Sequence, residues 1–311
     1  MADNKPELLV TPTEVNDIER LVAAGATAIM IGEERFGLRL AGEFTREHVK
    51  EAVSIAHRLG AKVYVAMNAI FHNERVDELA DYLRFINDCS VDAVVFGDPA
   101  VLMTAREVAP DMKLHWNTET TATNYYTANY WGRKGAKRAV LAREINMDAI
   151  VEIKENADVE IEVQVHGMTA MFHSKRKLIG NYMEFQGKSL SVENRGKDRN
   201  MFLYDPERDA KYPIFEDSSG THIMSPKDIC IIDELEEMLD AGIDSFKIDG
   251  ILKSVDYLEE VVNMYREAID LYFEDEEKYD SKKEEYLKRI NEIQPHNREI
   301  DTGFFFKETV Y

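Results

Sequence analysis

Polar side chains follow most of the apolar runs of strand length in this 311-residue chain, at the point where each run ends. They are Glu33 and Arg35, then Asn68, Asp98, Asn117 with Thr118 and Glu119, Arg143 with Glu144, His166, and Lys247 with Asp249. Imidazole and carboxylate groups can transfer protons, and guanidinium and ammonium groups bind carboxylates. If the runs are parallel strands of one α/β domain, these groups meet on one face.

We select three of these residues as candidate catalytic groups, His166, Glu144 and Asp249. The candidate substrate-binding residues are Arg35, Asn68, Asn117, Glu119, Arg143 and Lys247. Arg35, Arg143 and Lys247 are the candidates for a carboxylate ligand. Two alternatives remain open at this point: His166 is a satisfied structural imidazole, and Arg143 simply pairs with Glu144.

His166 and Gly167 mark the change between a strand and a long polar segment. The strand covers Val159 to Val165, and we expect irregular structure from about residue 168 until about Ser225. A histidine between a strand and an oversized loop is a candidate for proton transfer or ligand binding near neutral pH.

Eight apolar runs alternate with amphipathic, helix-like segments. The runs begin near Leu8, Ala28, Lys62, Ala93, Lys113, Arg138, Val159 and Ser245. This order predicts a closed (β/α)₈ barrel with a long insertion after the seventh strand. An open doubly wound sheet is the alternative, but no G-x-G-x-x-G follows a strand. Ser225 to Asp228 predict the cap of a helix that runs to about Asp240 and contains Cys230.

The predicted division places the barrel in residues 1–275, with its insertion in 168–224. Residues 276–311 then form a C-terminal helix and an aromatic tail, Asp301 to Phe306, which we expect to pack on the barrel.

Composition indicates a soluble, globular, cytoplasmic protein. Hydrophobic residues make up 44% and charged residues 31%, and no apolar run approaches bilayer length. The net charge of −21 disfavours a polyanionic partner, although Arg133-Lys134, Lys137-Arg138 and Lys175-Arg176-Lys177 are local basic clusters. Cys89 and Cys230 alone cannot hold an iron–sulfur cluster, and no pattern of metal ligands is present, so we predict no metal.

Several segments resemble peptidase family U32, a family also called collagenase-like proteases. The resemblance is carried by AGATAIMIGEERFGLR (24–39), GAKVYVAMNAIFHN (60–73), NTETTATN (117–124), AVLAREI (139–145), NRG (194–196) and residues 225–254. The signature of this family continues after His166-Gly167 with two cysteines. The resemblance implies a (β/α)₈ barrel. It also implies a place among oxygen-independent hydroxylases of tRNA, ribosomal RNA or ubiquinone precursors, with prephenate as hydroxyl source.

Members of this kind use four cysteines to hold a [4Fe–4S] cluster. The resemblance places Ala170, Lys177, Asp198 and Cys230 at those positions, so only Cys230 is retained. One thiolate cannot hold such a cluster. The chain is most similar to the short, cysteine-poor proteins of Gram-positive bacteria, and we expect it to match the first of two paired tRNA-hydroxylation proteins.

The leading hypothesis is a clusterless subunit of prephenate-dependent tRNA wobble-uridine 5-hydroxylation. Its partner would be a cysteine-bearing U32 paralogue, with a homodimer as the alternative, and tRNA would bind indirectly or through the local basic clusters. A U32-type protease that activates water through Glu144 or Asp249 is the rival hypothesis. A non-catalytic scaffold for the paralogue is the third.

Overall fold

The computed structural model describes residues 5–190 and 196–308, and within these residues eight parallel strands close into a barrel. β11 pairs with both β1 and β7, which joins the first strand of the series to the seventh. The predicted (β/α)₈ barrel is therefore confirmed. The barrel strands are β1 (Glu7–Val10), β2 (Ala28–Ile31), β3 (Lys62–Met67), β4 (Ala93–Phe96), β5 (Leu114–Trp116), β6 (Arg138–Val140), β7 (Glu160–Ser174) and β11 (Ser245–Ile248).

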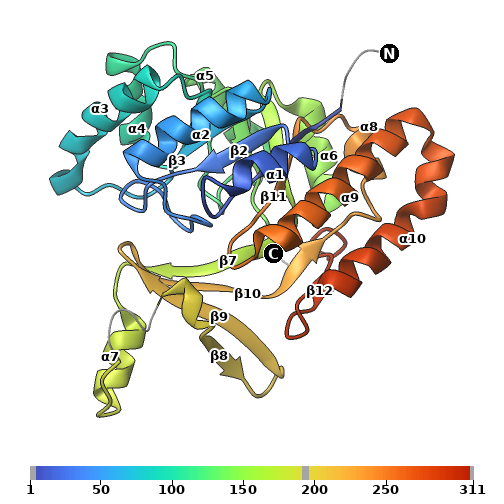
Figure 1. The fold of residues 1–311 in the computed structure, drawn as a ribbon. Coiled ribbons are helices and arrows are strands. Elements are labelled where there is room, and N and C mark those ends of the chain that lie inside the picture. The colour runs from blue at the N-terminus through green and yellow to red at the C-terminus, as the bar shows by residue number, and fades with distance from the viewer. Residues whose placement is uncertain (1–4, 191–195, 309–311) are drawn as a thin grey trace.

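Helices surround the barrel, and several begin at a residue whose side chain caps the helix (Figure 1). The side chains of Thr45, Asp98, Asn124, Asn146 and Ser254 each accept a hydrogen bond from a backbone N–H of the first turn. The helices are α1 (Asp17–Ala23), α2 (Arg46–Arg58), α3 (Asn73–Asp88), α4 (Pro99–Val108), α5 (Tyr125–Arg133), α6 (Met147–Asn156), α8 (Glu236–Asp240), α9 (Val255–Glu274) and α10 (Glu276–Ile293).

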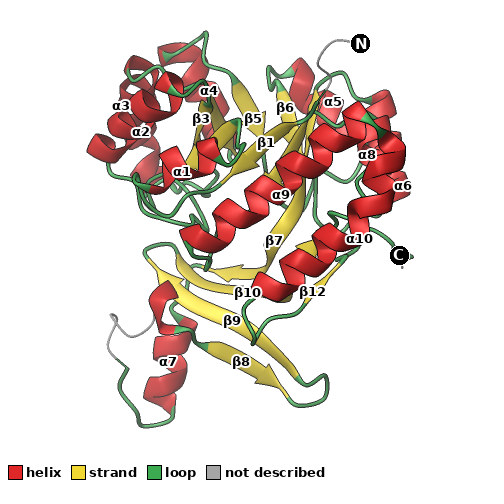
Figure 2. Ribbon diagram, turned by 45° about the vertical axis from the view of Figure 1, so that its right-hand side comes forward, coloured by secondary structure: helices red, strands yellow, loops and turns green. Residues whose placement is uncertain are grey.

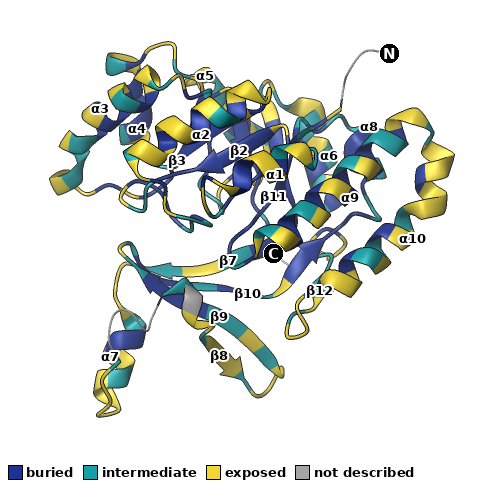
Figure 3. Ribbon diagram, viewed as in Figure 1, coloured by how far each residue is buried: buried dark blue, intermediate teal, exposed yellow. Residues whose placement is uncertain are grey.

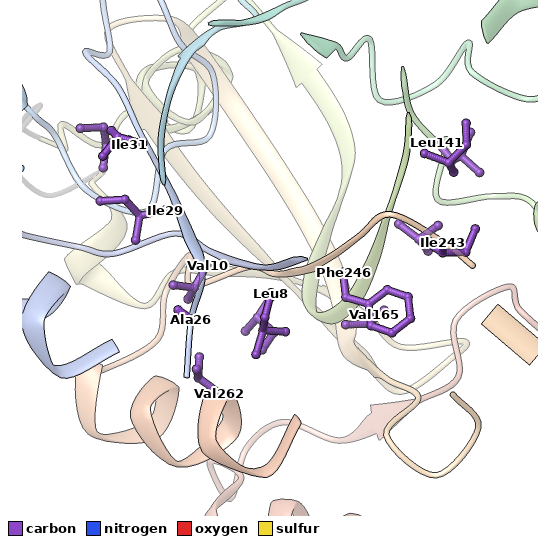
Figure 4. Close-up of a cluster of buried hydrophobic side chains, with 14 of the residues drawn as sticks. Leu8, Val10, Ala26, Ile29, Ile31, Leu141, Val165, Ile243, Phe246 and Val262 are labelled. Carbon is purple, nitrogen blue, oxygen red and sulfur yellow. The ribbon is translucent and has the colours of Figure 1, made fainter. Parts of the chain in front are cut away.

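The main core lies between the outer face of the strands and the helices. Leu8 and Phe246 are fully buried there, and Figure 4 shows Leu8 between the strands and Val262 of α9. Alternate residues such as Leu9 point into the barrel, where a second, smaller cluster fills the interior. The barrel strands are buried (Figure 3). Because both of their faces are covered, they are mostly apolar.

Arg138 fills the barrel interior at the amino ends of the strands, opposite their carboxyl ends. Arg138 makes ion pairs with Glu7 at 2.6 Å, Glu160 at 2.8 Å and Glu162 at 3.2 Å. The expectation that Arg138 belongs to an available basic cluster is wrong, since its guanidinium is buried among these carboxylates.

The insertion is an antiparallel sheet rather than an irregular loop, which corrects the expectation for residues 168–224. β7 continues past the barrel and pairs with β10 (Gly220–Cys230), and β9 (Ala210–Asp217) and β8 (Phe202–Asp205) extend the sheet. Figures 1 and 2 show this sheet beyond the barrel, with α7 (Leu178–Phe185) at its far side. A short 3₁₀ turn, η2, covers Lys197–Arg199.

The helix predicted from Ser225 is also wrong, because residues up to Cys230 belong to β10 and α8 begins only at Glu236. The Asp228 carboxylate does not cap a helix. It is fully buried and binds the side chains of Lys253, Arg298 (2.6 Å) and Gln294 (2.7 Å).

The C-terminal segment returns to the barrel. Tyr279 of α10 is fully buried and donates to the carbonyl of Ile232 at 2.7 Å. β12 (Ile300–Asp301) pairs with β10, and Phe305 is 6% exposed. Among the described residues, no helix is long and apolar enough to cross a membrane.

Candidate functional site

The carboxyl ends of the barrel strands surround a cavity of about 380 Å³, which we call the mouth cavity. It is lined by Leu38, Arg39, Asn68, Ile70, Gly97, Asn117, Thr118, Glu119, Thr120 and residues 170–173 of β7. A narrow recess with six of the same residues continues to Arg143, Lys247 and Asp249. The structure therefore brings together Asn68, Asn117, Glu119, Arg143, Lys247 and Asp249, which the sequence placed on one face. Asp98 instead caps α4.

Three cations and two carboxylates form the charged floor of this site. Glu119 makes ion pairs with Arg39 and, at 3.4 Å, with Arg143. Lys247 Nζ lies 2.9 Å from Asp249 Oδ2. All five side chains are largely buried, and the cations outnumber the carboxylates. The floor thus has one uncompensated positive charge and suits an anionic ligand.

Glu119 is held in its charged form by this surrounding. Burial alone would raise the pKa of the Glu119 carboxyl, but the charges of Arg39, Arg143 and Lys247 together lower it to about 2. Glu119 and Arg39 both adopt positive φ angles, 65° and 54°. Each such backbone costs roughly 1–2 kcal/mol for a residue with a side chain. Strain at two contacting residues is typical of a functional site.

Two asparagines line the cavity, and the backbone fixes the side-chain oxygen of each. Asn68 Oδ1 accepts from the backbone N–H of Leu38 at 2.8 Å, and Asn117 Oδ1 accepts from the backbone N–H of Glu119 at 3.0 Å. Because each oxygen already bonds the backbone, the amide nitrogens are the atoms left to donate to a ligand.

Arg39, which was not predicted from the sequence, occupies the position in the mouth cavity that was expected for Arg35. The Arg35 side chain is 59% exposed and pairs with Glu78 of α3 at 2.5 Å, outside the mouth cavity. Both arginines lie in the loop after β2, and only the backbone path of that loop decides which one turns inward. Spacing within the loop was the available signal, and it does not distinguish them.

His166 lies outside the mouth, in the layer between β7 and α9. It is fully buried, its Nε2 lies 2.7 Å from the Tyr257 hydroxyl, and its ring packs edge-on against Tyr265. Burial lowers the pKa of His166 to about 3, so the imidazole is neutral near neutral pH. This geometry favours the structural alternative for His166 over a catalytic role.

Glu144 is exposed and does not line the mouth cavity or its recess. The alternative in which Arg143 pairs with Glu144 is wrong, because the carboxylate beside Arg143 belongs to Glu119. Asp249 is at the mouth, but its carboxylate is bound by Lys247. Neither carboxylate is placed as a free general base for water.

The backbone conformation after His166 requires a glycine at position 167. Its φ of 101° lies in the left-handed region, and a side chain there would collide with the carbonyl of Asp249. The backbone N–H of Asp249 also donates to the carbonyl of His166 at 3.0 Å. Gly167 therefore lets β7 pass close to the backbone that follows β11 before β7 leaves the barrel.

The residues do not fit an iron–sulfur cluster. Ala170 of β7 lies opposite Met224 of β10, whereas Cys230 of β10 lies opposite His166 of β7. His166 and Ala170 are four residues apart, which corresponds to roughly 13 Å along the strand. The Cys230 thiol lies near Tyr265 under α9, and burial raises its pKa to about 12. Lys177 precedes α7, and nothing is described for the side chain of Asp198. Asn194 and Arg195 lie outside the described residues. Cys230 is therefore not a neighbour of Ala170, the position with which it was expected to share a cluster site.

Among the described residues, no group of three or more His, Cys, Asp or Glu side chains could hold a metal ion.

The fold and the site define a class, a (β/α)₈-barrel protein with a cationic mouth and a β-sheet insertion after the seventh strand. The model of Peptidase family U32 matches residues 13–310. The chain belongs to peptidase family U32.

Two relatives from Bacillus subtilis (strain 168) place the chain within the family. It is 70% identical to "tRNA hydroxylation protein P2" over 307 residues, 99% of each chain. It is 35% identical to "tRNA hydroxylation protein P1" over 262 residues, which are 84% of this chain and 62% of P1. The expected match to the first of the paired proteins is therefore wrong in its number, since P2 is the more similar.

A solved structure confirms the fold. "The Structure of the U32 Peptidase Mk0906" matches with a TM-score of 0.51 and 14% identity, and it covers 80% of this chain and 94% of that chain.

Proposed function

We propose that this protein is a clusterless subunit of a tRNA wobble-uridine 5-hydroxylation system. The observation that carries the proposal is the 70% identity, over nearly the full length, to a protein named for tRNA hydroxylation. The positions at which the family holds a cluster lack thiols here, at Ala170 and Lys177. The subunit then contributes ligand binding, and a partner contributes the redox chemistry.

The mouth cavity is the proposed site for a small carboxylate, with prephenate as the candidate co-substrate. Arg39 and Arg143 already hold one carboxylate, that of Glu119, and Lys247 lies on the same floor. A ligand carboxylate can share these guanidinium groups because each has five N–H donors. The amide nitrogens of Asn68 and Asn117 would orient the hydroxyl or carbonyl groups of the ligand.

The proposed partner is a longer, cysteine-bearing U32 paralogue. In B. subtilis two proteins named P1 and P2 exist, and this chain matches 62% of P1 and 99% of P2. A pair of unequal lengths supports a division of labour between a short subunit and a longer one. Copurification of this protein with a cysteine-bearing paralogue from the same organism tests the partnership directly.

Deletion of the gene tests the function. In a strain that also lacks any oxygen-dependent route, the deletion should lower the 5-hydroxyuridine-derived nucleosides of tRNA, measured by mass spectrometry after digestion. The wild-type gene should restore them. Unchanged nucleosides in the deletion strain would contradict the proposal.

The same strain separates this function from the two alternatives. If the protein is only a scaffold, a variant with Arg39→Ala and Arg143→Ala restores the modification as well as the wild type does. If it is a protease, purified protein cleaves denatured collagen or casein, and Asp249→Asn abolishes the cleavage. We expect neither result, because Asp249 is bound by Lys247 and the arginines line the proposed ligand site.

A further inference from the structure

Exposed apolar side chains stand on the rim of the mouth cavity. Ile70, Met171 and Phe172 line the cavity, yet they are 61%, 58% and 46% exposed. Large apolar groups gathered at one edge of a polar cavity are typical of a surface that another molecule covers. Their place beside the floor that carries Arg39 and Glu119 makes this molecule a candidate substrate.

A basic and aromatic continuation leads away from this rim along the insertion. Lys175, Arg176 and Lys177 are all exposed, and Lys175 Nζ donates to the carbonyl of Ile70 at 3.1 Å. The next element is α7, where Tyr182 and Phe185 are 60% and 85% exposed. Residues three apart on a helix share one face. We call Ile70 and residues 171–188 together the rim strip.

The charge of the rim strip differs from that of the rest of the chain. Residues 171–188 contain four Lys or Arg residues and one Glu, whereas the whole chain has 38 basic and 59 acidic residues. A polyanion is repelled by the protein as a whole and attracted at this strip. Aromatic side chains interleaved with cations bind single-stranded nucleic acid, since bases stack on the rings and phosphates bind the cations.

We propose that the rim strip binds a single-stranded segment of RNA. Its phosphates contact Lys175, Arg176 and Lys177, and its unstacked bases pack on Phe172 and on the aromatic face of α7. Sequence-specific recognition of RNA typically uses loops whose bases are splayed out in this way. A base next to Phe172 then lies at the entrance of the mouth cavity. The choice of RNA rests on the proposed function, and the assignment of the surface goes beyond it.

A second exposed basic cluster, Arg133 with Lys134, provides a matched control. Arg133 ends α5 and Lys134 follows it, so both lie where the chain enters β6, at the opposite end of the barrel from the mouth. Arg133→Glu with Lys134→Glu changes the net charge as much as Arg176→Glu with Lys177→Glu does. Only the second pair lies on the rim strip.

Fluorescence anisotropy with a labelled anticodon stem-loop, at several salt concentrations, tests the proposal on the full chain. Arg176→Glu with Lys177→Glu should lower the affinity at least tenfold and reduce the slope of log K against log salt by about 1.4, the value for two lost phosphate contacts on a single strand. Phe185→Ala should lower the affinity about fivefold or more without changing that slope. The control pair should bind as the wild type does, and circular dichroism checks that all variants are folded.

Any of three results would rule out the rim strip as an RNA-binding surface. They are wild-type affinity in the Arg176/Lys177 variant, an equal loss of affinity in the control pair, or no RNA binding by the wild type at 50 mM salt. Binding of the paralogue, but not of RNA, to this strip would do the same. If gene deletion still lowers tRNA hydroxylation, the proposed function stands and only this surface is removed.

Discussion

Glu119→Gln tests the electrostatic description of the mouth, because this change removes one charge and keeps the shape of the side chain. Glutamine imitates the protonated carboxyl at a place where the structure favours the charged form. The pKa of Glu119 is about 2, compared with 4.5 for an ordinary glutamate. One pKa unit corresponds to about 1.4 kcal/mol, so the ionised carboxylate stabilises the folded state by about 3 kcal/mol at pH 7.

The general cost of breaking a buried ion pair is of similar magnitude. Removal of one partner from a buried ion pair costs about 3–5 kcal/mol, since the other charge loses its compensation. Glu119 is 13% exposed at its side chain and compensates two arginines of 10% and 14% exposure. We therefore expect Glu119→Gln to lower the free energy of unfolding by about 3 kcal/mol at pH 7.

The pH dependence gives this prediction its sign. A carboxyl with a lowered folded-state pKa stabilises the protein above its unfolded pKa, and the contribution disappears as the pH falls from about 4.5 toward 2. Urea unfolding of wild type and variant at pH 7, 5, 4 and 3 measures this difference, with Glu144→Gln, at an exposed position, as the matched control. A difference below about 1 kcal/mol at pH 7, or one that stays constant down to pH 3, would refute the reasoning.

Three further substitutions test separate parts of the structure. Arg39→Ala should abolish most of the tRNA modification in the complementation assay while Arg35→Ala retains it, because only Arg39 lines the mouth cavity; equal effects of the two would contradict this assignment. Burial lowers the pKa of His166 to about 3 in the folded protein, so the imidazole stays neutral there while the unfolded chain binds one more proton between pH 6.5 and 3. The free energy of unfolding therefore decreases as the pH falls through this range, by up to about 1.4 kcal/mol per pH unit. Urea unfolding of His166→Phe should lack this part of the slope, and an unchanged slope would show that another group causes it. Gly167→Ala should lower the free energy of unfolding by roughly 2–4 kcal/mol, since it combines a left-handed φ with a clash at Asp249, and a loss under 1 kcal/mol would mean that the backbone relaxes easily.

The barrel could be predicted because its signals are local. Each strand is an apolar run of a few residues, such as Ala28 to Ile31, and the helix that follows has a capping residue such as Thr45 or Asp98. Alternation of the two elements then leaves few topologies.

The insertion could not be predicted in the same way, because its strands depend on distant partners. Ile229, Ile231 and Ile232 after Ser225 are compatible with a helix as well as with a strand. In the structure β10 pairs with β7 and β12, and Asp228 is fixed by residues far along the chain, Lys253 and Arg298. Such long-range contacts leave no local trace in the sequence.

For the site, position at a strand end predicted Asn68, Asn117, Glu119, Arg143, Lys247 and Asp249 correctly as neighbours. The same rule misplaced His166, because a bulge where β7 meets β11 shifts the register and turns this side chain toward α9. It chose Arg35 over Arg39 because a loop conformation, with Arg39 at positive φ, is not visible in residue types.

We propose that this chain supplies a binding mouth and holds no iron–sulfur cluster of its own. Anaerobic reconstitution of the isolated protein with iron and sulfide, followed by desalting and metal analysis, tests it most directly. We predict a colourless protein without bound iron, and a complex with the paralogue whose iron is lost when the cysteines of the paralogue are replaced. A brown isolated chain with near-stoichiometric iron and sulfide would contradict the account.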